Sequence, residues 1–180
     1  MRSLTIALLA VSVVAPGFAQ KFSPENLAPS IPTPSSVVDR MLEAGRVKAG
    51  DVVYDLGSGD GRIVIAAAQK FGAKAVGVEV VPDLCRQAQQ RIKELGLSDR
   101  ASIVEANVFH VDISAATVVT MYFMTDSNER LRPNLEKYLK PGTRVISNMF
   151  PIKGWKPMSV EHVKAGMDYT FYVYEVGHTK

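Results

Sequence analysis

The stretch VYDLGSGDGR, residues 53–62, decides the fold of this chain. Its apolar start predicts a buried strand, and the apolar run at residues 63–68 predicts a helix lying on a sheet. Between them, Gly57, Gly59 and Gly61 allow sharp turns and let a ligand approach the backbone closely. The N-terminus of the following helix offers unpaired N–H groups to polar atoms. The stretch therefore predicts a nucleotide-type binding pocket.

Two features distinguish this pocket from an NAD site. The glycines follow the pattern G-x-G-x-G, whereas the NAD fingerprint places its third glycine one residue later. Asp55 ends the first strand, where it would repel a pyrophosphate and attract a cationic ligand. Residues 73–80 predict a second strand that ends in Glu79, at the spacing where an acid contacts ribose hydroxyls in such folds. An NAD-dependent oxidoreductase is therefore a distant alternative.

The sequence DLGSGDGR followed by VGVEV resembles the class I S-adenosylmethionine (SAM)-dependent methyltransferases. Later segments, IPTP at 31–34, LRPNL at 131–135, LKPGTRV at 139–145 and GWKP at 154–157, are similar to the small protein-lysine methyltransferase-like family with mitochondrial and bacterial members. The resemblance covers about residues 29–157. It implies an α/β fold with a Rossmann-like seven-stranded sheet, mostly parallel with an antiparallel C-terminal strand, and helices on both faces.

The resemblance also implies which residues bind SAM. Asp55 and the glycine loop are expected to hold the methionine part, and Glu79 the ribose hydroxyls. Asn107 stands where the family often has Asp, and would meet the adenine amine through its carbonyl oxygen. A capping or turn role is the alternative for each residue. The expected cofactor-binding residues are Thr33, Asp55, Gly57, Ser58, Gly59, Gly61, Glu79, Asn107 and Val108.

Methyl transfer from a sulfonium requires the protein mainly to align donor and acceptor and to exclude water. We expect Tyr122, Asn148 and Trp155 to act at the acceptor, because they follow strands or lie on a loop near them. Trp155 could contact a cationic side chain. Alternatively, Trp155 is a hydrophobic plug on a loop, and Tyr122 packs in the core of the sheet. Phe123 is expected to lie in that core.

The predicted function is SAM-dependent methylation of a protein lysine amine. The acceptor stays open, because relatives often carry an acid at the position of Met149, and no general base is assigned. A small-molecule methyltransferase and a non-catalytic SAM-binding module are the alternatives. The small, dispersed net charge of +3 does not favour nucleic acid. The single Cys85 and three unclustered histidines predict no metal site.

The sequence predicts that residues 1–19 form a secretory signal peptide. Arg2 precedes an apolar run over residues 4–14, and Gly17-Phe18-Ala19 forms a small-x-small cleavage site. The run is about half the ~20 residues needed to cross a bilayer, so no stable membrane span is predicted. Residues 20–30 read as a linker and 31–180 as one methyltransferase domain. We expect a periplasmic or secreted protein, or a cytoplasmic one if the signal is unused.

Strand and helix patterns alternate along that domain, which predicts a parallel sheet closed by a final hairpin. Pro133 is expected to interrupt the helical segment near 126–139. Strands are expected at 51–56, 74–80, 101–105, 117–123, 143–148, 158–164 and 169–176, and further helices at 34–46, 61–71 and from Pro82 to Gly96.

Overall fold

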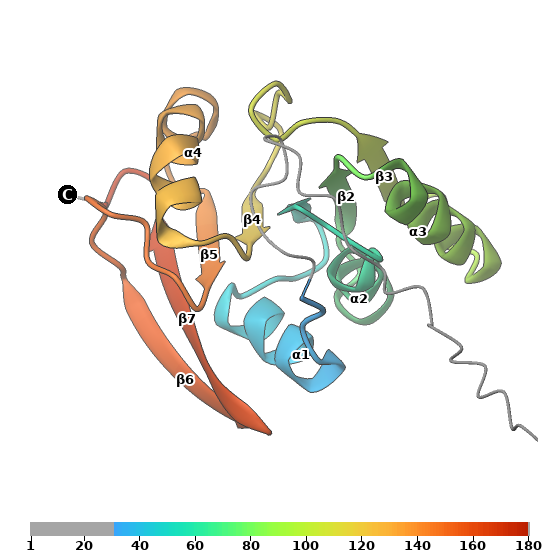
Figure 1. The fold of residues 1–180 in the computed structure, drawn as a ribbon, viewed down its shortest axis with the longest axis horizontal. Coiled ribbons are helices and arrows are strands. Elements are labelled where there is room, and N and C mark those ends of the chain that lie inside the picture. Colours follow the sequence, from blue (N-terminus) through green and yellow to red (C-terminus); the bar gives the residue numbers. More distant parts are fainter. Residues whose placement is uncertain (1–30, 180) are drawn as a thin grey trace, which may run out of the picture.

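A computed structural model describes residues 31–179, and helices and strands alternate along most of that span (Figure 1). The predicted signal peptide and the linker lie outside the described residues. The helices are α1 (Ser35–Ala44), α2 (Arg62–Phe71), α3 (Pro82–Glu94) and α4 (Thr125–Tyr138). The strands are β1 (Val52–Leu56), β2 (Lys74–Glu79), β3 (Ala101–Glu105), β4 (Val118–Met121), β5 (Arg144–Asn148), β6 (Ser159–Ala165) and β7 (Met167–Glu175).

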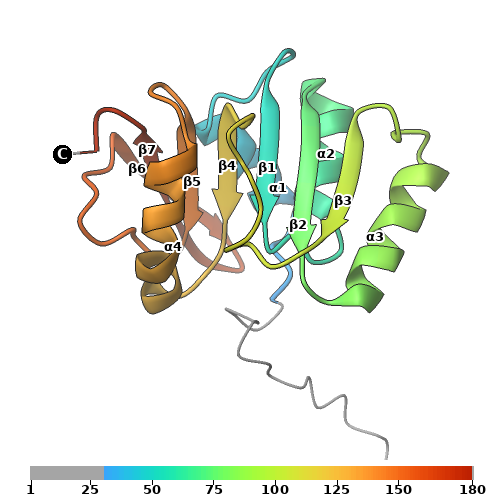
Figure 2. The ribbon, with the colours of Figure 1, turned by 90° about the horizontal axis from the view of Figure 1, so that it is seen from above.

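The strands form one seven-stranded sheet in the order β3-β2-β1-β4-β5-β7-β6 (Figure 2). Strands β1 to β5 are parallel, whereas β7 is antiparallel to both β5 and β6. The mostly parallel sheet with its antiparallel C-terminal hairpin confirms the prediction. The order reverses between β1 and β4, and ligands of such sheets bind outside the carboxyl ends of the strands at that point.

The two faces of the sheet carry separate cores. On one face α1, α2 and α3 pack against the sheet through residues such as Met41, Val64 and Ala88. On the other face α4 packs through Leu131 and Leu135. The predicted arrangement of helices on both faces is thus confirmed, and Figures 1 and 2 show α4 opposite α1 and α2. No helix within residues 31–179 is long and apolar enough to cross a membrane.

Two element predictions were wrong in detail. Helix α4 continues through Pro133 instead of being interrupted there. Pro133 is exposed, so the helix carbonyl that loses its N–H partner lies on the side of the helix that faces water. Strand β4 ends at Met121, two residues before its predicted end, so Tyr122 and Phe123 lie in the connection to α4.

Candidate active site

The glycine loop lies between β1 and α2, where the strand order reverses. Gly57, Gly59 and Gly61 all have left-handed backbone angles, with φ of 76°, 54° and 75°, which side chains would disfavour. A Cβ on Gly57 would come within 2.8 Å of Cε1 of Phe123, so the Phe123 ring closes one side of the loop. Phe123 is buried, as the sequence predicted.

Glu79 at the end of β2 holds this loop in place. Its Oε2 accepts a 2.8 Å hydrogen bond from the Gly59 N–H, and its Oε1 accepts 2.9 Å bonds from the N–H groups of Val80 and Val81. These three donors fix the carboxylate at the carboxyl edge of the sheet. Each carboxylate oxygen can accept more than one hydrogen bond, so ribose hydroxyls can still be bound there.

Asp55 is the penultimate residue of β1 and a buried carboxylate, and the pKa of its side chain is raised to about 7. Burial is the main cause, because it removes water from the charged form. The nearby carboxylates of Glu79 and Asp60 raise the pKa further, while the Thr120 hydroxyl donates a 2.7 Å hydrogen bond and opposes the shift. Three carboxyl groups thus lie close together here, and a bound cation would stabilise their ionised forms.

Arg62 ties the loop to the segment before α1. It forms a two-pronged ion pair with Asp60, with Nε to Oδ1 at 2.9 Å and NH2 to Oδ2 at 2.6 Å. This pairing lowers the pKa of the Asp60 carboxyl. The third donor, NH1, binds the Thr33 carbonyl oxygen at 2.7 Å, and Thr33 is buried. The structure thus brings Thr33 next to the loop.

The predicted ligand residues Ser58, Asn107 and Val108 have local roles in this structure. The Ser58 side chain packs over Gly77 of β2, where an added Cβ would lie 2.5 Å from the Ser58 hydroxyl oxygen. Asn107 accepts a 3.0 Å hydrogen bond from the Phe109 N–H through its side-chain oxygen. Val108 is buried in the core beneath α4. Asn107 and Val108 still follow β3 at the edge where the adenine is expected.

On the other side of β4 from Asp55, the carboxyl edge of the sheet carries aromatic rings and a side-chain amide. Tyr122 follows β4 and stacks on Phe150, which follows β5, with ring centroids 6.3 Å apart. Burial, followed by Tyr169 on β7, raises the pKa of the Tyr122 hydroxyl. Asn148 ends β5 and is fully buried. Tyr122 and Asn148 thus both lie at the carboxyl ends of the neighbouring strands β4 and β5.

Trp155 lies elsewhere, and its predicted place over the acceptor is wrong. Its ring packs edge-on against Tyr174 at 5.6 Å, and its indole N–H donates a 3.0 Å hydrogen bond to Glu136 near the C-terminal end of α4. Tyr174 pairs with Val145 near the amino end of β5. Since the ring is buried among these groups, Trp155 is the hydrophobic plug of the alternative interpretation.

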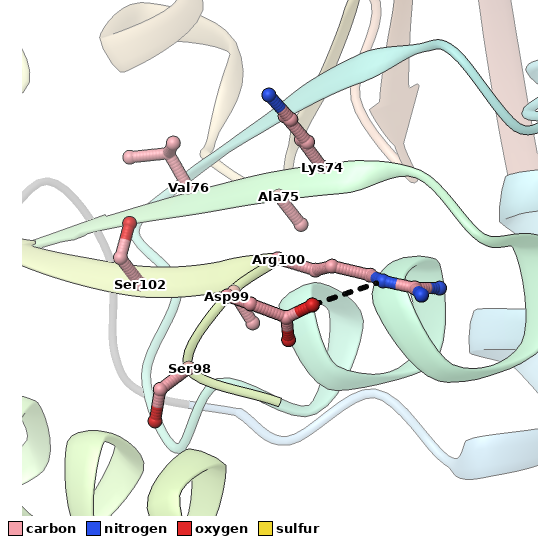
Figure 3. Close-up of a pocket in the computed structure, with 8 residues that line it drawn as sticks. Lys74, Ala75, Val76, Ser98, Asp99, Arg100 and Ser102 are labelled. Carbon is pink, nitrogen blue, oxygen red and sulfur yellow. Dashed lines mark ion pairs between the residues drawn. The ribbon is translucent and has the colours of Figure 1, made fainter. Parts of the chain in front are cut away.

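A shallow hollow at the opposite edge of the sheet is separate from this site (Figure 3). It lies at the amino ends of β2 and β3, beside the Asp99–Arg100 ion pair. Asp55 lies at the carboxyl end of β1 and the glycine loop follows it, so the hollow is not the expected ligand site. It is lined by Lys74, Ala75, Val76, Ser98, Asp99, Arg100, Ala101 and Ser102.

Comparison with known proteins agrees with this geometry. The family model of the ANTKMT methyltransferase domain matches residues 55–159, which include Asp55, Glu79 and Asn148. The chain belongs to this methyltransferase family. Since Asp55 and Glu79 provide carboxylates for the positive charges and the ribose of SAM, and a methyltransferase structure 46% identical to this chain holds S-adenosyl-L-homocysteine, the chain is a SAM-dependent methyltransferase.

Three relatives are informative. A protein-lysine N-methyltransferase of Saccharolobus islandicus is 54% identical over 84% of this chain and 96% of that protein. A human ATP synthase lysine N-methyltransferase is 32% identical over 93% of this chain and 70% of that protein. A structure described as an RNA methyltransferase from Salinibacter ruber with S-adenosyl-L-homocysteine is 46% identical, with a TM-score of 0.76 over 81% of this chain and 94% of that one.

Sequence reasoning missed three residues that shape the methyltransferase site. Thr120 is a hydroxyl in an otherwise apolar strand, a pattern that could have marked it as a partner of Asp55. Arg62 directly follows the loop and so could have been paired with Asp60. Gly77 of β2 has no side chain and so leaves space for the Ser58 side chain from the loop after β1. No local sequence pattern indicates a contact between residues this far apart.

Proposed function

We propose that this methyltransferase transfers a methyl group from SAM to the ε-amine of a lysine in a protein. Two relatives support a lysine acceptor by their names: the archaeal protein at 54% identity is a protein-lysine N-methyltransferase, and the human protein is a lysine N-methyltransferase of ATP synthase. Both match this chain over more than four fifths of its length.

The proposal rests on the side chains at the carboxyl edge of the sheet, which differ in character on the two sides of β4. Asp55 and Glu79 provide negative charge on one side, for a cationic donor. Tyr122 and Phe150 provide stacked rings on the other side, at the ends of β4 and β5. Rings accept the apolar stem of a lysine, and burial among them lowers the pKa of its amine, which favours the uncharged, reactive form.

The reaction needs alignment more than acid–base chemistry. When bound, SAM supplies a methyl group on a positively charged sulfur. The lysine first loses a proton to solvent; its nitrogen then bonds to the methyl carbon while the carbon–sulfur bond breaks and leaves its electron pair on sulfur. The residues of the chain hold the two reactants in line and exclude water, and alignment of this kind supplies much of the rate enhancement.

A labelling experiment tests the proposal. Purified protein is incubated with methyl-labelled SAM and an extract of its host, and label is measured separately in protein, RNA and small metabolites. Glu79→Ala, which removes the acceptor of three backbone hydrogen bonds at the cofactor loop, is the inactive control. We expect label in protein, and only with the unmodified enzyme.

The other fractions test the remaining functions. The 46% identical Salinibacter protein is described as an RNA methyltransferase, so RNA is the second candidate acceptor, and label in RNA would replace lysine with it. Label in metabolites alone would indicate a small-molecule methyltransferase. SAM binding without label in any fraction would indicate a non-catalytic module.

We propose in addition that the chain is exported. The support is the sequence alone: a positive residue, an apolar run and a small-x-small site within residues 1–19. Mass spectrometry of the protein from its native host should find Gln20 as the first residue. An intact N-terminus in the cytosolic fraction would contradict export.

A further inference from the structure

The side chain of Asn148 is fully buried, and neither its Oδ1 nor its Nδ2 has a hydrogen-bond partner among residues 31–179. Such an arrangement is uncommon, because a buried polar group without a hydrogen bond destabilises the folded state. Nearby Asn128 is only half unpaired: its Nδ2 donates to Ser147 Oγ at 3.2 Å and to the Phe150 carbonyl oxygen at 3.1 Å, whereas its Oδ1 also has no partner among residues 31–179. The Asn148 amide therefore calls for an explanation in function.

The register of the strands places this amide on the cofactor side of the sheet. Ile146 of β5 faces α1, because a Cβ on Gly45 would lie 2.7 Å from its Cδ1. Alternate residues of a strand share a face, so Asn148 faces the same side. Thr120 pairs with Asp55 on one side and with Ile146 on the other, so all three lie on that face.

Tyr122 is the neighbour of Asn148 along the carboxyl edge. It follows Met121, the last residue of β4, which pairs with Ser147, so Tyr122 and Asn148 both lie at the carboxyl ends of neighbouring strands. Tyr169, which belongs to the core on the α1 face, contributes to the raised pKa of Tyr122 and so indicates that the Tyr122 hydroxyl lies toward that face. Asp55 lies one strand further away on that face, across β4. The amide thus lies on the far side of β4 from Asp55, the carboxylate that is expected to attract the cationic donor.

The turn after Asn148 is fixed in an unusual conformation. Met149 has a left-handed φ of 66°, which side chains rarely adopt, and its N–H donates a 2.7 Å hydrogen bond to the Thr170 carbonyl oxygen. The Ser147 hydroxyl donates a 2.6 Å bond to the Phe150 carbonyl oxygen. These contacts fix the position of Phe150, which stacks on Tyr122 and lies two residues after Asn148.

We propose that Asn148 binds the acceptor amine: its Oδ1 accepts a hydrogen bond from the lysine nitrogen and points the nitrogen lone pair at the methyl group. A lysine has a long apolar stem with a terminal amine, so it can pass beside the Tyr122 and Phe150 rings and reach a polar group set back from the surface. A neutral amide suits this role because, unlike a carboxylate, it does not strongly favour the protonated amine. This inference rests on the proposed lysine acceptor.

The test uses Asn148→Leu, which keeps the branched shape and removes both polar atoms, with Asn148→Ala as a second variant. Thr143→Val is the matched control: Thr143 is buried just before the opposite end of the same strand, and its hydroxyl donates to the Ala116 carbonyl oxygen. Initial rates of labelling of extract proteins, SAM affinity by calorimetry and the melting temperature are measured for each full-length protein.

We expect both Asn148 variants to lose about 10- to 100-fold in rate, with SAM affinity within about twofold of the unmodified enzyme. Asn148→Leu should melt no lower than the unmodified enzyme, since it removes unpaired polar groups, whereas Thr143→Val should melt lower and keep its rate per folded molecule. If the unmodified enzyme methylates lysine and Asn148→Leu does so at an equal rate, the inference is wrong and the proposed function stands. If the unmodified enzyme labels no lysine, both are wrong.

Discussion

The Thr120 hydroxyl donates a 2.7 Å hydrogen bond to Oδ1 of Asp55, across the two strands where the order of the sheet reverses. This hydrogen bond stabilises the ionised Asp55 carboxylate, but burial outweighs it, because the pKa of Asp55 still rises to about 7. When a cation binds next to a buried acid with a pKa near neutral, the acid loses its proton more easily. Both the affinity for SAM and the stability of the free enzyme should therefore depend on pH through Asp55.

Cofactor affinity should fall in acid. SAM carries positive charge, so it should bind the ionised form of Asp55 more tightly. Below about pH 7 the carboxyl must release its proton on binding, and the affinity should fall by up to about tenfold per pH unit. Calorimetry between about pH 5.5 and 8.5 measures this. Asp55→Asn should bind weakly and show a flatter profile; an equal slope in both proteins would assign the effect to another group.

Stability without SAM should change in the opposite sense. Because the folded-state pKa of Asp55 lies above its ordinary 3.8, the folded protein holds this proton more tightly than the unfolded chain. The stability from this group is present below about pH 4 and is lost as the pH rises through about 7. At about pH 8, Asp55→Asn should therefore melt higher than the unmodified enzyme. A lower melting temperature there would contradict this account of the buried charge.

The contact between β2 and the glycine loop should be sensitive to a single added methyl group. In Gly77→Ala the new Cβ would lie 2.5 Å from the Ser58 hydroxyl oxygen and 2.6 Å from Ile103 Cδ1. We expect a loss of about 1–3 kcal/mol in unfolding free energy and weaker SAM binding, because the loop must shift. Adding Ser58→Gly should restore part of both losses. Strictly additive effects in this double-mutant cycle would show that the two residues do not interact.

Substitutions of Trp155, a structural residue, and of Tyr122, a residue of the active site, should affect stability and reaction rate differently. Trp155→Phe keeps a ring but loses the hydrogen bond to Glu136, and Trp155→Ala should lower the unfolding free energy by about 3–5 kcal/mol. Neither should change the rate of methyl transfer per folded molecule. Tyr122→Ala should do the reverse, lowering the rate with little loss of stability. Denaturant unfolding and initial rates decide between these outcomes, and a slow but stable Trp155→Phe enzyme would restore Trp155 to the site.

The sequence predicted the fold well because its signals are local. Glycine positions, apolar runs and Pro82 indicated the order of the strands and helices and most of their ends. Asp55 and Glu79 were expected to share an edge, because parallel strands in this fold end on the same side. The predictions were wrong where distant contacts decide the outcome. The position of Trp155, for example, depends on its contacts with Glu136 and Tyr174, which are distant in the sequence.

Methyl transfer to lysine is the central claim, and the identity of the labelled amino acid tests it most directly. Protein labelled by the enzyme with methyl-labelled SAM is hydrolysed completely, and the labelled product is compared with methylated amino-acid standards. We predict that the label is recovered as Nε-methylated lysine and is absent when Glu79→Ala replaces the unmodified enzyme. Label recovered in another amino acid, or in RNA and metabolites with none in lysine, would contradict the account.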